Sequence, residues 1–179
     1  MNNQIRVRQL LASDVEAYQD IWLEGLKLDP QSFAATYQQW RKKSRSQWIE
    51  DLEFGLVFGG FIGDRLMGIV KLEIDCCNHS AYLSSLYVRQ DVRGKGLAKA
   101  MVKYLLDYAR TWVNQVHLRV VATNILARNF FQGLGFEICG VTSDGYLDGR
   151  SRLILAIALS VNQPQTTTSQ GTSRNLAII

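Results

Sequence analysis

Apolar residues recur at intervals of three and four in four segments of the chain, which is the pattern of helices that bury one face. The first segment follows Ser13, which forms a capping-box sequence with Glu16, and the second follows Pro30, a residue that favours the first helical turn. The four apolar faces are Val15, Tyr18, Ile21, Trp22 and Leu26; Phe33, Tyr37 and Trp40; Trp48, Ile49 and Leu52, behind a cap at Ser44 and Gln47; and Leu97, Ala98, Met101, Val102, Leu105, Leu106 and Ala109. The pattern therefore predicts about four helices, with the aromatic residues in the core or along a substrate groove.

Other segments are short, rich in β-branched residues and bounded by turn residues, as is typical of strands. Gly63 and Asp64 separate two such segments and so predict a hairpin. In chain order the predicted strands cover residues 5–8, 56–62, 66–74, 81–88, 116–122, 136–141 and 151–159, and the last two are joined through turns at Asp144–Gly145 and Asp148–Gly149. Helices and strands alternate along the chain, so we expect an α+β (mixed α/β) fold.

Composition bounds the class of protein. The chain has 179 residues, 47% of them hydrophobic and 20% charged, which predicts one globular domain over residues 1–160. Residues 161–179 are mostly polar and predict a flexible tail. No apolar run approaches the roughly 18 residues of a membrane span, and the N-terminus has no signal-peptide core, so we expect a cytoplasmic protein without membrane contact.

Charge and cysteine content exclude several kinds of site. The net charge of +4 suits an anionic cofactor and is too small to indicate nucleic-acid binding. The three cysteines (Cys76, Cys77 and Cys139) are poorly spaced for a disulfide framework or a zinc site, so we expect free thiols and no metal. A basic run at residues 41–45 is typical of a solvated face, with binding of an acidic peptide or a nucleic acid as the weaker alternative.

The stretch from Leu86 to Ala98 passes from a strand through a glycine loop into a helix. The first amides of a helix have no intrahelical acceptor and carry partial positive charge, and Gly94 and Gly96 let a ligand approach the backbone. Arg93 and Lys95 add full charges, so the loop suits a phosphate or pyrophosphate. A Walker loop fits less well, because only Gly94-Lys95-Gly96 of its Gly-x-x-x-x-Gly-Lys-Ser/Thr pattern is present. A dinucleotide loop also fits less well, because Lys99 replaces its third glycine.

A second motif follows the predicted strand 116–122. Asn124-x-x-Ala127-x-x-x-Phe131-x-x-x-Gly135-Phe136 places a helix cap, a small residue and a terminating glycine at fixed intervals. Together with Arg93-x-x-Gly96-x-Ala98, this motif resembles the signatures of the GNAT superfamily of acetyl-CoA-dependent N-acetyltransferases. The resemblance covers about residues 81–141.

The resemblance implies a GNAT-like fold: a mostly antiparallel mixed sheet of about seven strands, flanked by about four helices. The sheet splays between the strands that end at Val88 and Ala122, and acetyl-CoA lies in the splay. Its pantetheine pairs with the backbone of Leu86, Tyr87 and Val88 like an added strand. The implied pyrophosphate site comprises Arg93, Gly94, Lys95, Gly96, Leu97 and Ala98, and Asn124, Ala127, Phe130 and Phe131 flank the pantetheine and thiol.

The resemblance also implies a chemistry, in which an amine attacks the thioester directly. A backbone N–H near Val88 stabilises the developing oxyanion. Relatives often carry a tyrosine acid at the position of Phe131, which has no proton to give. Three explanations follow: another residue or water serves as the acid, the thiolate departs unprotonated, or catalysis is impaired. A thiol pKa of about 8.5 makes the thiolate a tolerable leaving group.

The general base is open at the level of sequence. Glu73 is the first candidate, acting directly or through water, with a solvent-facing strand acid as the equal alternative. Asp75 is a weaker candidate, and we interpret His79 and His117 as structural or solvated. Tyr87 and Tyr146 could supply a proton, although the sequence does not place them at the thiol.

These residues support two functional hypotheses. The first is an N-acetyltransferase that uses acetyl-CoA to acetylate a primary amine of a small molecule or peptide. The alternative, motivated by Phe131, is a CoA-binding regulatory or interaction module of the same fold with little turnover. The acceptor would be set by the region Trp22–Trp48 and the loop Asp144–Arg150, and a homodimer through the last strands is possible.

Overall fold

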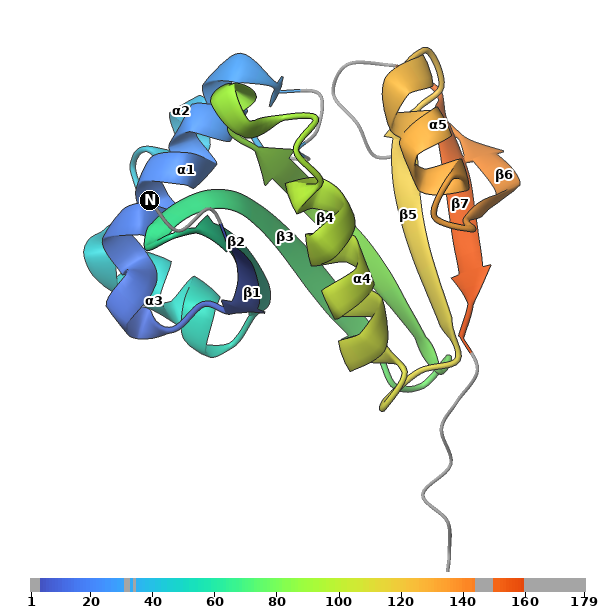
Figure 1. Ribbon diagram of the computed structural model, residues 1–179, viewed down its shortest axis with the longest axis horizontal. Helices are drawn as coiled ribbons and strands as arrows, with labels where there is room; N and C mark the ends of the chain where they lie inside the picture. The colour runs from blue at the N-terminus through green and yellow to red at the C-terminus, as the bar shows by residue number, and fades with distance from the viewer. Residues whose placement is uncertain (1–3, 31–32, 34, 144–149, 160–179) are drawn as a thin grey trace, which may run out of the picture.

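A computed structural model describes residues 4–30, 33, 35–143 and 150–159, and in it seven strands form one sheet. The strand order is β1-β2-β3-β4-β5-β7-β6 (Figure 1). The strands are β1 (Ile5–Gln9), β2 (Leu56–Ile62), β3 (Arg65–Asp75), β4 (Ser80–Val88), β5 (Gln115–Val121), β6 (Glu137–Thr142) and β7 (Arg152–Ala158). The helices are α1 (Val15–Leu28), α2 (Tyr37–Trp40), α3 (Arg45–Glu53), α4 (Leu97–Ala109) and α5 (Ile125–Gln132), with 3-10 turns at Ala12–Asp14 and Gln90–Val92. The predicted mixed, mostly antiparallel architecture is confirmed.

The sheet divides at its one parallel pairing. Strands β4 and β5 pair only over Ser80–Tyr82 and Gln115–His117, and their ribbons then diverge (Figure 1). The other pairings are antiparallel. Strand β4 is irregular near the divergence, because Ser85 has a φ of 54° and the register with β3 shifts between Ile69 and Lys71. The expected splay between these two strands is therefore present.

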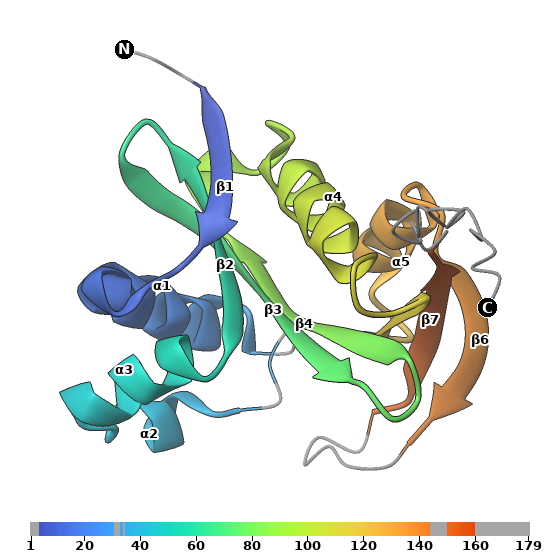
Figure 2. The same ribbon diagram turned by 90° about the horizontal axis from the view of Figure 1, so that it is seen from below.

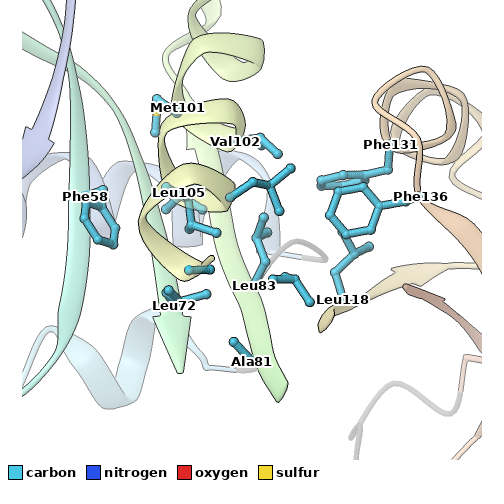
Figure 3. Close-up of a cluster of buried hydrophobic side chains, with 14 of the residues drawn as sticks. Phe58, Leu72, Ala81, Leu83, Met101, Val102, Leu105, Leu118, Phe131 and Phe136 are labelled. Atoms are coloured by element: carbon cyan, nitrogen blue, oxygen red, sulfur yellow. The ribbon is translucent and has the colours of Figure 1, made fainter. Parts of the chain in front are cut away.

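Helices cover both faces of the sheet, and each face has its own core. Helices α1, α2 and α3 lie on one side of β1–β4, and α4 lies on the other (Figure 2). The core under α4 includes Phe58, Leu72, Met101 and Leu105 and continues to Phe131 and Phe136 on the far side of the split (Figure 3). The second core gathers Tyr18, Trp22, Trp48, Ile69 and Tyr87. The core under α4 contains side chains from both sides of the split, so its burial holds the two halves of the sheet together.

Two predicted helix starts are wrong. Ser13 does not cap α1: residues Ala12–Asp14 form a 3-10 turn, and Asp14 accepts a hydrogen bond from the Leu11 amide (2.9 Å). The carboxylate of Asp14 is held there by two bonds from Arg8 of β1, at 2.7 and 2.8 Å. Helix α1 therefore begins at Val15, after this turn, and not behind a cap at Ser13.

The predicted helix from Pro30 is also shorter than expected. Helix α2 covers only Tyr37–Trp40, behind a cap in which Thr36 Oγ1 accepts a bond from the Gln39 amide (3.3 Å). Phe33 is not helical; its ring packs edge-on against Trp22, with the centroids 5.2 Å apart. In contrast, the cap predicted for α3 is confirmed, since Ser44 and Gln47 bond each other reciprocally.

Other predictions concern special residues and regions. The three cysteines are free and exposed, as expected, and Cys139 lies in β6. The part of the chain that the structure describes contains no helix long and apolar enough to cross a membrane, and no cluster of three or more His, Cys, Asp or Glu side chains suited to a metal. The turns at Asp144–Gly145 and Asp148–Gly149, Tyr146 and the predicted tail lie outside the described residues.

Candidate functional site

A cleft of about 1160 Å³ opens where β4 and β5 part. It runs from the N-terminus of α4 to the aromatic side chains of α1 and α2, and α5 forms its far wall. The sequence-predicted residues that line it are Glu73, Leu86, Tyr87, Val88, Arg93, Gly94, Gly96, Leu97, Ala98, Asn124, Ala127, Phe130 and Phe131. Three segments that are distant in sequence therefore contribute to one site.

The glycine loop forms an open cradle at one end of this cleft. Gly94 and Gly96 have φ values of 77° and 85°, a region that favours glycine. A Cβ added at either position would meet no atom within 4 Å, so both residues face open space. Gly96 is the N-cap of α4, and the first-turn amides behind it have no intrahelical acceptor. The cradle has the shape and the polarity that a pyrophosphate needs.

The two basic residues of the loop behave differently. Arg93 lines the cleft, and its Nε donates a hydrogen bond to the Val88 carbonyl (2.9 Å). Lys95 does not line the cleft, because its ammonium folds back onto the Asp91 carbonyl (3.0 Å). The structure thus brings Arg93 to the candidate phosphate site and assigns Lys95 to support of the loop.

Strand β4 presents an unpaired edge to the cleft. Beyond Tyr82, no described strand pairs with the side of β4 that faces β5. Leu86 to Val88 lie on this stretch, and all three line the cleft. An extended ligand could pair with their backbone as an added strand would.

Helix α5 supplies the opposite wall. Asn124 caps it, since its Oδ1 accepts a bond from the Ala127 amide (3.0 Å). Phe131 lies inward and is only 6% exposed; its ring centroid is 5.1 Å from that of Phe130 and 5.5 Å from that of Phe136 (Figure 3). Phe131, where the resemblance led us to expect a tyrosine acid, is therefore part of an apolar cluster at the wall of the cleft.

Of the candidate bases, Glu73 lines the cleft, whereas Asp75 and His117 do not. Glu73 lines the cleft, and the Ser84 hydroxyl donates to its Oε1 at 3.5 Å. Asp75 does not line it; its carboxylate accepts bonds from the amides of Cys77 and Asn78 in the turn between β3 and β4. His117 does not line the cleft either, and its ring lies 5.5 Å from that of Tyr82. Glu73 is the candidate base that the fold brings to the site.

Tyr87 is unsuited to donate a proton to a ligand. Its hydroxyl donates to Glu24 Oε1 at 2.9 Å. Burial, reinforced by this bond and by the charge of Glu24, raises the pKa of Tyr87 to about 12. Glu24 also accepts a bond from Arg89, so the phenol belongs to a network under α1.

Several cleft residues were not singled out as site residues from the sequence. They include Lys71, Ser84 and Arg119, whereas Trp22, Phe33 and Trp40, which were expected in the core or along a substrate groove, also line the cleft. The sequence does contain a signal for Lys71. It lies two residues after Ile69 and two before Glu73 on β3, and residues at this spacing share one face of a strand. Which helix covers that face depends on tertiary structure.

Comparison with known proteins identifies the family. A model of the acetyltransferase (GNAT) family matches residues 15–136, more than half of the chain. The chain belongs to this acetyltransferase (GNAT) family. It is accordingly an acyltransferase, and acetyl-CoA is the acyl donor. The glycine cradle, the edge of β4 and the capped α5 are the parts of this GNAT chain that fit such a donor.

Relatives support the same assignment. An uncharacterised N-acetyltransferase of Methanocaldococcus jannaschii is 23% identical over 151 residues, which cover 83% of this chain and 88% of that protein. A GNAT acetyltransferase structure from Streptococcus pneumoniae is similar in fold, with a TM-score of 0.75 at 15% identity, over 88% of this chain and 100% of that one. The structure of the PaiA N-acetyltransferase of Thermoplasma acidophilum in complex with coenzyme A is also similar in fold, with a TM-score of 0.70 at 19% identity. The match covers 87% of this chain and 99% of that one.

Proposed function

We propose that this protein transfers the acetyl group of acetyl-CoA to a primary amine of a small molecule or peptide, by direct attack of the amine on the thioester. The observation that carries the proposal is the cleft itself. The α4 cradle, the free edge of β4 and Glu73 all face one space of about 1160 Å³. When bound, acetyl-CoA supplies an activated acetyl group.

The chain's residues have distinct roles in this proposal. Arg93, Gly94, Gly96, Leu97 and Ala98 hold the pyrophosphate, and the backbone of Leu86–Val88 pairs with the pantetheine. The Val88 amide donates to the thioester oxygen, where negative charge develops. Glu73 accepts the proton that the amine loses, directly or through water. Phe131 gives no proton, and a thiol pKa of about 8.5 allows the sulfur to leave as thiolate.

Calorimetric titration with acetyl-CoA and CoA, together with a thiol-release assay over a panel of amines, tests the proposal. We expect binding of both nucleotides and release that one class of amine accelerates. Glu73→Gln should lower kcat by about 10²–10⁴-fold while CoA affinity stays unchanged. Glu50→Gln is the matched control, because Glu50 is exposed on α3 and does not line the cleft. Failure to bind either nucleotide would exclude the proposed site.

Phe131 motivates a second candidate function. A CoA-binding regulatory module with little turnover needs the cradle but no proton donor. Binding of CoA without amine-stimulated release would favour it, and a gain of turnover in Phe131→Tyr would then attribute the low activity to the missing hydroxyl. Rapid acetylation of an amine by the unaltered chain would exclude it. Cytoplasmic location and the homodimer stay predictions.

A further inference from the structure

Lys71 places an ammonium group in the cleft, on the strand that pairs with β4. It lies on β3, its side chain is half-buried, and its Nζ lies 5.4 Å from the ring centroid of Trp22. Among the described residues, no carboxylate forms an ion pair with this ammonium and no group accepts a hydrogen bond from it. By comparison, Lys43 reaches Asp51 at 2.5 Å.

The surroundings of Lys71 make an unpaired cation costly. Trp22 beside it is buried, and the rings of Phe33 and Trp40 lie 5.2 and 4.5 Å from that of Trp22, centroid to centroid. Aromatic faces attract a cation but replace only part of its lost hydration. An anionic group brought by a ligand would supply the rest.

Glu73 lies two residues further along the same face of β3 and also lines the cleft. Residues at this spacing stand about 7 Å apart along a strand. The face therefore presents a cation and an anion side by side. A ligand with an ammonium and a carboxylate separated by a few bonds matches this pair, with its ammonium at Glu73 and its carboxylate at Lys71.

Because Glu73 is the base of the proposed transfer, the pair lies at the proposed reaction centre. Lys71 is opposite Ser84, and the next residue of β4, Ser85, has the left-handed backbone that marks the irregular edge. We propose that Lys71 binds a carboxylate of the acceptor, so that the acceptor is a free α-amino acid with an apolar side chain that packs on Trp40. This inference rests on the proposed acetyl transfer and names its substrate class.

A carboxylate fits better than a phosphate at this position. One ammonium in an aromatic setting matches one negative charge, whereas phosphate groups favour several cations and backbone amides together. Such a set exists elsewhere in the cleft, in the loop from Arg93 to Ala98. The nearby carboxylate of Glu73 would also repel a doubly charged group.

The test compares amino acids with their decarboxylated amines. Leucine, phenylalanine and tryptophan are paired with 3-methylbutylamine, phenethylamine and tryptamine, at equal concentrations of unprotonated amine. CoA release gives kcat and KM for the unaltered chain and for Lys71→Met, Lys71→Arg and Lys42→Met. Lys42 is the control because it is an exposed lysine outside the cleft.

We expect the unaltered chain to prefer the amino acid of each pair. Lys71→Met should lower kcat/KM for the amino acid by about ten- to hundredfold, mainly through KM, because a charge-assisted hydrogen bond is lost. The decarboxylated amine should be unaffected, Lys71→Arg should restore most of the preference, and Lys42→Met should behave like the unaltered chain.

Other outcomes overturn the inference in distinguishable ways. Preference for the decarboxylated amines would contradict a carboxylate subsite and leave the proposed acetyl transfer standing. An equal loss for both members of a pair in Lys71→Met would assign Lys71 a structural role. Absence of CoA release with every amine, despite CoA binding, would contradict the proposed function and the inference together.

Discussion

The guanidinium of Arg93 is bonded to the backbone of Val88: Nε donates to the carbonyl oxygen at 2.9 Å. The bond ties the loop before α4 to the last residue of β4. The same side chain lies 3.7 Å from Asp29 at the end of α1. One residue thus fixes the phosphate cradle relative to the strand edge along which the pantetheine is proposed to lie.

Replacement of Arg93 tests this coupling. Arg93→Met removes both the bond to Val88 and a positive charge beside the cradle. We expect CoA affinity to fall by about ten- to hundredfold, in line with the loss of a charged hydrogen bond, and the remaining affinity to depend less on salt. Titration calorimetry at two ionic strengths measures both effects. The control is Arg110→Met at the other end of α4. Arg110 is exposed, and among the described residues its only ion pair is with Asp107. An equal loss of CoA affinity in this control would refute the assignment of Arg93 to the phosphate site.

A second test separates the open space at Gly96 from its backbone strain. Gly96→Ala places a methyl group where no atom lies within 4 Å, in the space assigned to the pyrophosphate. We expect CoA affinity to fall by at least about tenfold, besides a stability loss of about 1–2 kcal/mol from the left-handed backbone. Gly63→Ala introduces similar strain in the turn after β2, since its φ is 59°, but lies outside the cleft. It should lose stability and keep its CoA affinity; a loss of affinity in both variants would point to strain alone.

Phe131 should also matter for stability. Its buried ring contacts Phe130. It also packs against Phe136 and so links α5 to the core (Figure 3). Phe131→Ala should lower the free energy of unfolding by about 3–5 kcal/mol, because it leaves a cavity. Leu126→Ala on the same helix removes a side chain that is 84% exposed and should change it by less than about 0.5 kcal/mol. Urea denaturation compares the two, and similar effects would contradict the packing described.

Local signals explain why much of the fold could be predicted. The glycines before α4, the Asn124 cap and the Ser44 cap each act within about four residues of chain, so the sequence contains the whole interaction. The same holds for the hairpin of β2 and β3. Nothing comparable exists for Phe33, whose helical spacing is overridden by packing against Trp22. At Ser13 a competing local bond, from the Leu11 amide to the Asp14 carboxylate, replaces the expected cap.

The proposed acceptor side of the cleft could not be predicted from the sequence, because its contacts join residues that are far apart along the chain. Trp22 and Lys71 are 49 positions apart, and their contact follows from the packing of α1 on β3. The periodicity of β3 predicts which face Lys71 shares but not which helix covers it. The proposed cofactor side is built from motifs contiguous in sequence, whereas the proposed acceptor side is assembled from single residues of several elements.

The ion pair between Arg8 and Asp14, just before α1, should make the stability of the fold depend on pH. Two bonds from Arg8 hold the pKa of Asp14 below its usual value. A lowered pKa stabilises the folded chain above the unfolded value of about 4, and this stability is lost as the pH falls through the folded value. Asp14→Asn should therefore cost about 1–2 kcal/mol at neutral pH, and the difference should shrink below about pH 4. Denaturation curves from pH 7 to pH 3 measure this difference in the free energy of unfolding.

Asp64→Asn is the control, because the exposed Asp64 carboxylate lies 3.8 Å from Arg6. Its free energy of unfolding should stay close to that of the unaltered chain throughout this pH range. A pH-independent difference for Asp14→Asn would show that the bond to the Leu11 amide, and not the charge, carries the effect.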